Sequence, residues 1–285
     1  MDEAAGRPGL GDIGRLGLAT RRVKVGILQA RRLAAWAREP GSWRPAPMAP
    51  LADDRVLYEV AVEIAQPGAH PRLEAGKLRN LRLAAARIHG RSISAAHPFS
   101  FWRCVGRLTR ERGFDVGAEV RAGCVVPTVG GGVCLLSGAL FEMAVRLGWT
   151  ILERHGHTIS TRPVGDRRGD LDATLFWPQV DLRFAPPTTA ARLRVEVQGG
   201  ALIVGASGQP SGVTVAVRRE ELAGAPDFDA HRLVRIVTGA DGTGRQDVVA
   251  ISHKRRRPAD ALGRTCLTCD EQACQARDGL LRNVR

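Results

Sequence analysis

Three consecutive glycines, Gly130 to Gly132, constrain this chain more than any other feature, because a cysteine and an apolar helical pattern follow them. Glycine lacks a Cβ atom and accepts positive φ, so the run predicts a tight backbone loop. Apolar residues then recur at helical spacing, at Leu136, Leu140, Met143, Ala144 and Leu147. Gly148 is placed to end this helix. We therefore expect Cys134 in the first turn of a helix that a glycine loop introduces.

A cysteine at a helix start has a chemical consequence. The N-terminus of a helix carries about half a positive charge, and its free N–H groups favour a thiolate and can bind an oxyanion. Two histidines and then two acids follow Cys134 in the chain. This order is typical of enzymes with a cysteine nucleophile. We expect His157 to act as the base, with His155 as the alternative, and Asp172 to orient the imidazole, with Asp170 as the alternative.

Several short motifs in this region resemble those of the VanW family in their order and spacing. They are Asn80–Ala84, Pro98–Trp102, Val105-Gly106, Thr109, Gly113-Phe114, Gly117, Gly130–Cys134, Glu153–His157, Asp172–Thr174 and Val180–Phe184. The resemblance implies an association with glycopeptide resistance and cell-wall metabolism, with a cell-wall peptide or its precursor as the partner and no assigned activity. The family usually has glutamine directly after the cysteine, where this chain has Leu135.

Three interpretations of this region stay open. The first is a thiol-dependent acyl transfer or hydrolysis, similar to that of a peptidase, transpeptidase or amidase. The second is a binding module that cleaves nothing. The third is a metal site formed by Cys134, His155 and His157, since histidines two apart on a strand can share a metal. The candidate substrate-binding residues are Gly130, Gly131, Gly132 and Arg154, of which Arg154 is either a structural ion-pair partner or a carboxylate clamp.

A second group of cysteines lies near the C-terminus, at Cys266, Cys269 and Cys274. A Cys-x₂-Cys pair is the usual beginning of a zinc site, which needs four ligands, so His253 or a partner would complete it. An iron–sulfur cluster and unligated thiols are the alternatives. Cys104 and Cys124 lie in apolar contexts and are expected in the core.

The composition, with 44% hydrophobic and 25% charged residues among 285, is that of a globular protein. The net charge of +13 does not by itself indicate nucleic acid, because only three of the 42 basic residues are lysine and arginine is widely scattered. No apolar run is long enough to span a membrane, and no secretory signal is visible, so we expect a cytoplasmic protein. Residues 16–37 predict a basic surface helix with one buried stripe, or a contact with an anionic membrane.

The periodicities together predict an α+β fold, in which the helix bearing Cys134 packs on a mixed or antiparallel sheet. A helix is expected over residues 73–88, and strands over residues 151–159, 173–177 and 180–184. We predict four regions. They are a loose N-terminus with a helix and a Pro-rich linker (1–50), a VanW-like domain (51–187), a β-rich appendage (188–252) and a basic tail with the cysteine cluster (253–285).

Overall fold

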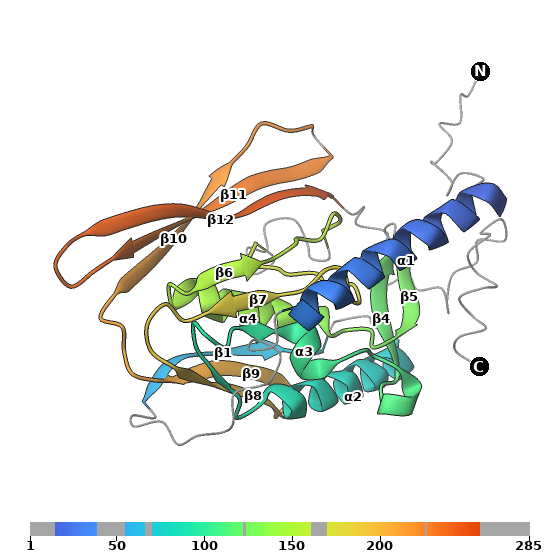
Figure 1. Cartoon of the computed structure of the whole chain (residues 1–285), viewed down its shortest axis with the longest axis horizontal. Helices are drawn as coiled ribbons and strands as arrows, with labels where there is room; N and C mark the ends of the chain where they lie inside the picture. The colour runs from blue at the N-terminus through green and yellow to red at the C-terminus, as the bar shows by residue number, and fades with distance from the viewer. Residues whose placement is uncertain are drawn as a thin grey trace. The chain divides into compact units, whose positions relative to one another are not determined.

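The computed structural model describes residues 15–38, 55–65, 70–121, 124–160, 170–225 and 227–256 (Figure 1). The chain divides into two compact units, Met1–Pro40 and Gly41–Arg285. The described part of the first unit is helix α1 (Arg15–Arg38). Of the buried stripe that the sequence predicted, Trp36 is buried, whereas Val23, Ile27, Leu28 and Leu33 are exposed. None of the helices in the described ranges is long and apolar enough to cross a membrane.

The second unit is an α+β fold built from antiparallel sheets, as the sequence predicted. Its helical elements are α2 (Pro71–Ile88), α3 (Phe101–Val105), the 3₁₀ helix η1 (Arg110–Arg112) and α4 (Cys134–Arg146). Its strands are β1 (Val56–Glu63), β2 (Ser92–Ile93), β3 (Phe99–Ser100), β4 (Val116–Arg121), β5 (Cys124–Val129), β6 (Thr150–Glu153), β7 (Arg183–Ala185), β8 (Ala191–Gln198), β9 (Ala201–Gly208), β10 (Thr214–Glu221), β11 (Phe228–Thr238) and β12 (Gly244–Arg255). They form sheets in the orders β1-β9-β8-β2, β3-β7-β6, β10-β11-β12 and the hairpin β4-β5.

Helix α4 is the centre of this unit. It contacts β1 and β9 on one side and β6 on the other (Figure 1). Because sheets flank it on both sides, its buried residues run almost continuously from Leu136 to Val145 rather than along one stripe. The helix ends as the sequence predicted: Gly148 has φ +70°, and its N–H donates to Val145 O over 3.1 Å.

The glycine loop before α4 is held by a buried side chain of helix α2. Asn80 Nδ2 donates to Asp115 O (2.9 Å) and Gly131 O (3.0 Å), and the N–H of Asp115 donates to Asn80 Oδ1 (2.7 Å). Gly131 has no room for a side chain, since an added Cβ would lie 2.4 Å from the backbone of Gly117. The backbones of the loop and β4 therefore touch, which requires glycine on both sides.

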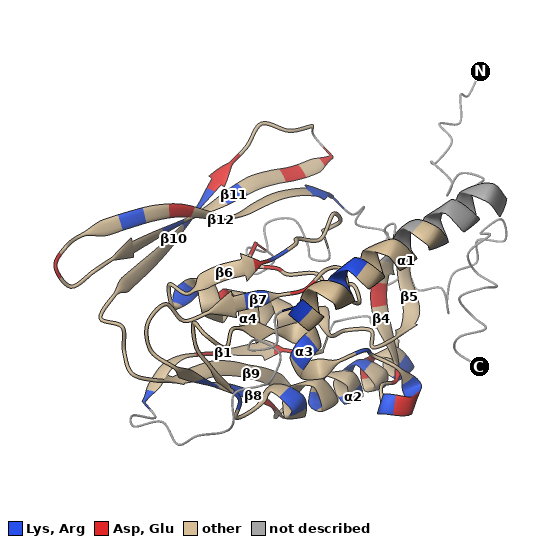
Figure 2. Cartoon of the chain, viewed as in Figure 1, with Lys and Arg blue, Asp and Glu red and all other residues tan. Residues whose placement is uncertain are grey.

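The region boundary predicted at residue 188 does not separate two sheets. Strands β8 and β9 pair with β2 and β1, so they belong to the same sheet as two strands of the predicted region 51–187. Only β10 to β12 form a sheet of their own. Arg235 of this sheet donates to Trp149 O (2.6 Å) and Arg245 to Gly148 O (3.3 Å), so the sheet is bonded to the turn after α4. Figure 2 shows both acidic and basic residues on it.

Two of the predicted strands are shorter than expected, and one is absent. Strand β6 ends at Glu153 rather than 159, β7 covers only residues 183–185, and residues 173–177 form no strand. The reason is that residues 154–159 make irregular bonds instead of a ladder. Thr174 N donates to His155 O (2.8 Å), and Arg255 N donates to Thr158 O (2.8 Å).

We predict that Asn80→Ala lowers the free energy of unfolding by about 3 kcal/mol, because it strips hydrogen bonds from three backbone groups that the loop buries. Urea denaturation of the purified protein measures this change. Arg79→Ala is the matched control, since its neighbouring side chain on α2 is exposed. Equal stability of the two variants would show that Asn80 does not hold the loop.

Candidate active site

The structure brings Cys134, His157 and Asp172 into one chain of contacts. Cys134 lies in the first turn of helix α4, as predicted, and its thiol interacts with the His157 side chain and helps to raise the pKa of that residue. On its other side, His157 Nδ1 lies 2.7 Å from Asp172 Oδ2. The backbone N–H of His157 donates to the same oxygen over 2.9 Å. With Nδ1 engaged by the carboxylate, Nε2 is the nitrogen left for the thiol.

The Asp172 carboxylate is divided between two sets of donors. Oδ2 accepts both bonds from His157, whereas Oδ1 contacts Arg154 Nη2 (2.8 Å) and Lys254 Nζ (2.9 Å). Arg154 Nε also donates to the Asp172 carbonyl over 2.8 Å, and its guanidinium lies 5.1 Å from the ring centre of Phe141 on α4. These contacts fix both the position and the rotation of the carboxylate.

The charges in the cluster shift the protonation of His157 and Asp172. Burial lowers the pKa of His157, but hydrogen bonds to Asp172 and Cys134 and the negative charge on both raise the pKa to about 9. Burial alone raises the pKa of Asp172. The hydrogen bond from His157 and the charges of Lys254 and Arg154 nevertheless hold the pKa of Asp172 well below its ordinary value. At neutral pH the cluster therefore contains an imidazolium and a carboxylate.

Helix α4 also fixes the segment that carries Asp172. Ser137, one turn after Cys134, donates from Oγ to Ala173 O over 2.5 Å. Gly138 lies beside the same segment, since a Cβ added there would be 3.6 Å from Leu171 O and 3.8 Å from the Asp172 Cα, which are ordinary contact distances. Helix α4 thus carries Cys134 and also holds the segment of Asp172, although 38 positions of the sequence separate the two residues.

The alternative residues lie elsewhere. His155 is 55% exposed, and its ring contacts Glu153 at 4.0 Å rather than Asp172. On a regular strand, side chains two residues apart point to the same face, so the rings of His155 and His157 would lie together. Residues 154–159 do not form a strand, and the two rings lie apart. The donor atoms of Cys134, His155 and His157 do not converge on a metal position among the described residues. Arg154 is only 5% exposed and bonds to Asp172, which fits the ion-pair role of the two considered for it.

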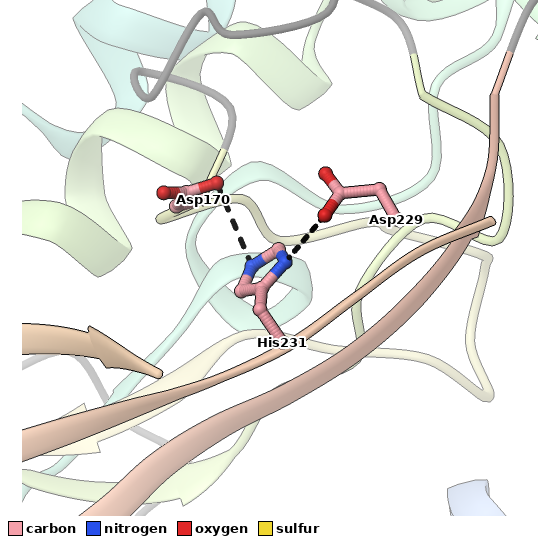
Figure 3. Close-up of side chains that lie close together, drawn as sticks. All are labelled: Asp170, Asp229 and His231. Atoms are coloured by element: carbon pink, nitrogen blue, oxygen red, sulfur yellow. Dashed lines mark hydrogen bonds and ion pairs between the residues drawn. The ribbon is translucent and has the colours of Figure 1, made fainter. Parts of the chain in front are cut away.

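Asp170 joins a separate cluster with Asp229 and His231 (Figure 3). The two carboxylates lie at opposite edges of the imidazole, Asp170 at 3.5 Å from Nε2 and Asp229 at 3.1 Å from Nδ1. Arg219 contacts both acids, at 3.1 Å and 2.5 Å. Its guanidinium already supplies the positive charge that a metal would bring, so the cluster is an ion-pair network linking the Asp170 segment to β10 and β11.

Lys254 was not expected at this site, because residues from 253 onward were predicted to form a basic tail. In the structure, β12 continues to Arg255, and Lys254 is buried with 5% of its surface exposed. The overlooked signal is the period-two pattern at Ala250, Ser252 and Lys254, all of which are buried. Such a pattern places the lysine on the inner face of the strand.

The other cysteines with a predicted role lie partly outside the described residues. Cys266, Cys269 and Cys274, the predicted zinc ligands, lie outside the described residues. Cys104 is free, and burial raises its pKa to about 11. A thiol with so high a pKa reacts slowly near neutral pH, so Cys104 serves as an internal reference for the reactivity of Cys134.

Fold and site together define an α+β protein with a cysteine, histidine and aspartate in contact at the start of a central helix. Residues 76–206, which include all three, match the family model described as VanW like protein. The resemblance predicted from the motifs is confirmed, and the protein is VanW-like over this region.

Two curated relatives align with part of the chain. One is the Vancomycin B-type resistance protein VanW of Enterococcus faecalis, 33% identical over 109 residues, which are 38% of this chain and 40% of that protein. The other is the Uncharacterized protein YoaR of Bacillus subtilis, 33% identical over 126 residues, 44% of this chain and 41% of that protein. The matches therefore span about two fifths of each relative. No solved structure matches the chain significantly.

We predict that His157 stabilises the fold most at low pH. Its folded pKa is raised from 6.5 to about 9, so its contribution is complete below pH 6.5 and is lost as the pH rises through 9. The difference in unfolding free energy between wild type and His157→Gln should accordingly shrink by about 3 kcal/mol over this window.

Urea denaturation at several pH values and constant ionic strength measures this difference. The matched control is His155→Gln, whose exposed ring should leave the pH profile unchanged. A His157→Gln difference that stays constant with pH would contradict the proposed charge on His157.

Proposed function

We propose that the protein is a thiol enzyme that transfers or hydrolyses acyl groups on peptidoglycan peptides or their precursors. The observation that carries the proposal is the contact chain from the Cys134 thiol through His157 to the Asp172 carboxylate. This is the arrangement in which an acid orients an imidazole toward a nucleophile. The substrate class rests on the similarity to the vancomycin resistance protein VanW, which aligns over two fifths of its length.

In the proposed reaction, the Cys134 thiolate attacks an amide carbonyl and forms a carbon–sulfur bond. The carbon–nitrogen bond then breaks, and the His157 imidazolium gives its proton to the leaving amine. Water or a second amine attacks the thioester, with His157 accepting the proton of the attacking group, and the thiolate is released. Water gives hydrolysis, and an amine gives transpeptidation.

The oxyanion of this reaction needs a hydrogen-bond donor near the thiol. The N–H groups of Leu135, Leu136 and Ser137 bond to the carbonyls of Gly132 and Val133. No backbone acceptor among the described residues takes the N–H of Cys134 itself. We therefore assign the oxyanion to this N–H, which replaces the broader expectation that several N–H groups of the helix start share it.

The direct test is the chemical reactivity of Cys134. We predict that iodoacetamide labels Cys134 fastest among the six cysteines at pH 6 to 7, because an imidazolium and a helix N-terminus stabilise its thiolate. His157→Gln should slow this labelling at least tenfold, and Asp172→Asn should have an intermediate effect. Peptide mass spectrometry after timed labelling measures each site.

Labelling of Cys134 only after denaturation would reject the enzyme and leave the binding module. A second assay separates these two classes. Incubation with peptidoglycan stem peptides should produce an acyl adduct on Cys134 by intact-mass measurement. Cys134→Ser should form no thioester, whereas a binding module keeps its affinity for the peptide in that variant. Leu135→Gln, tested alongside, shows whether the usual family residue changes the rate.

A further inference from the structure

The sheet formed by β10, β11 and β12 lies beyond residue 206, where the match to the family model ends. We propose that this sheet is part of the site and that Lys254 of β12 is a positioning residue, which holds the Asp172 carboxylate so that its other oxygen faces His157. The inference rests on the proposed function, because it concerns how the same three residues are aligned.

The contacts of the Asp172 carboxylate support this role of Lys254. Lys254 Nζ lies 2.9 Å from Oδ1, while Oδ2 receives both bonds from His157. Rotation of the carboxylate about its Cβ–Cγ bond would break the contacts on both oxygens at once. The Lys254 side chain is 7% exposed, and a buried ammonium without its carboxylate is costly, so the pair resists separation.

The backbone of β12 is also bonded to the segment that carries His157. Ile159 forms a parallel bridge with Arg255, in which Arg255 N donates to Thr158 O (2.8 Å) and Ser160 N donates to Arg255 O (3.0 Å). These bonds begin at the residue that follows His157. The strand that carries Lys254 thus also holds the segment that carries the imidazole, so one rigid element fixes both members of the His–Asp pair.

The other two strands of the sheet, β10 and β11, contact the chain just before Asp172. Arg219 of β10 contacts Asp170 at 3.1 Å, and His231 of β11 contacts the same residue at 3.5 Å (Figure 3). Each strand of the sheet therefore contributes one side chain to the stretch 170–172. A sheet that served only to cover the surface would not need three buried or half-buried polar contacts to one short segment.

The experiment compares Lys254→Met, Lys254→Arg and wild type by labelling of Cys134 at pH 7. Displacement of a catalytic group by about 1 Å can slow a reaction about 100-fold, so we expect Lys254→Met to slow labelling between about tenfold and 100-fold. Lys254→Arg, which keeps the charge, should restore most of the rate. The matched control is Arg235→Met, which removes another buried cation of the same sheet without touching Asp172.

A double-mutant cycle tests whether Lys254 acts through Asp172. If it does, Lys254→Met should add little to the effect of Asp172→Asn on the labelling rate, because both changes break the same alignment. Additive effects would overturn the proposal. Wild-type labelling in folded Lys254→Met, or equal slowing by Arg235→Met, would overturn it as well. Should Lys254→Met not fold, Lys254→Gln replaces it in all of these comparisons.

A spectroscopic measurement keeps this inference separate from the enzyme proposal. The proton that His157 Nδ1 shares with Asp172 should give a downfield NMR signal in wild type and Lys254→Arg, and the signal should disappear in Lys254→Met. Its retention in folded Lys254→Met rejects the positioning role whether or not Cys134 is reactive. If wild-type Cys134 is unreactive but the signal depends on Lys254, the enzyme proposal fails and the positioning role stands.

Discussion

The Asp172 carboxylate is the interaction on which the rest of the site depends. It is 15% exposed and accepts hydrogen bonds or ion pairs from Arg154 and His157, both in the segment 154–159, and from Lys254 on β12. A buried charge is stable only when such partners surround it, so the carboxylate can hold together segments that form no regular ladder. This explains why residues 154–159 leave the sheet after β6 and still have a defined conformation.

Close backbone packing fixes the position of the start of α4. The glycine loop touches β4 at Gly117 and is bonded by Asn80, so the start of α4 cannot shift along its axis without breaking these contacts. Cys134 is therefore placed by the packing of α2 against the loop, and His157 by the ion pairs of Asp172. The loop glycines are therefore required by this packing, whatever role they have in binding a substrate.

Local patterns predicted local features well. The glycine run followed by apolar residues at helical spacing predicted α4 with Cys134 in its first turn, and the family motifs contain both His157 and Asp172. Lys254 was missed because its role arises from a strand far along the chain, and a His-Lys-Arg run is usually solvated. The early end of β6 was missed because residues 155–158 bond to Thr174, Asp172 and Arg255 instead of forming a ladder, and periodicity does not register such contacts.

The balance of charge in the site connects its stability with its chemistry. Arg154, Lys254 and the imidazolium of His157 bring three positive charges to one carboxylate, and the N-terminus of α4 adds a partial positive charge. An excess of buried positive charge is unfavourable unless an anion lies close by. Asp172 is the anion that keeps these charges in place, and its hydrogen bond helps to raise the pKa of His157 to about 9. The same ion pairs that hold the irregular segments in place therefore also keep the imidazole charged, which is the form that the proposed reaction uses to protonate its leaving amine.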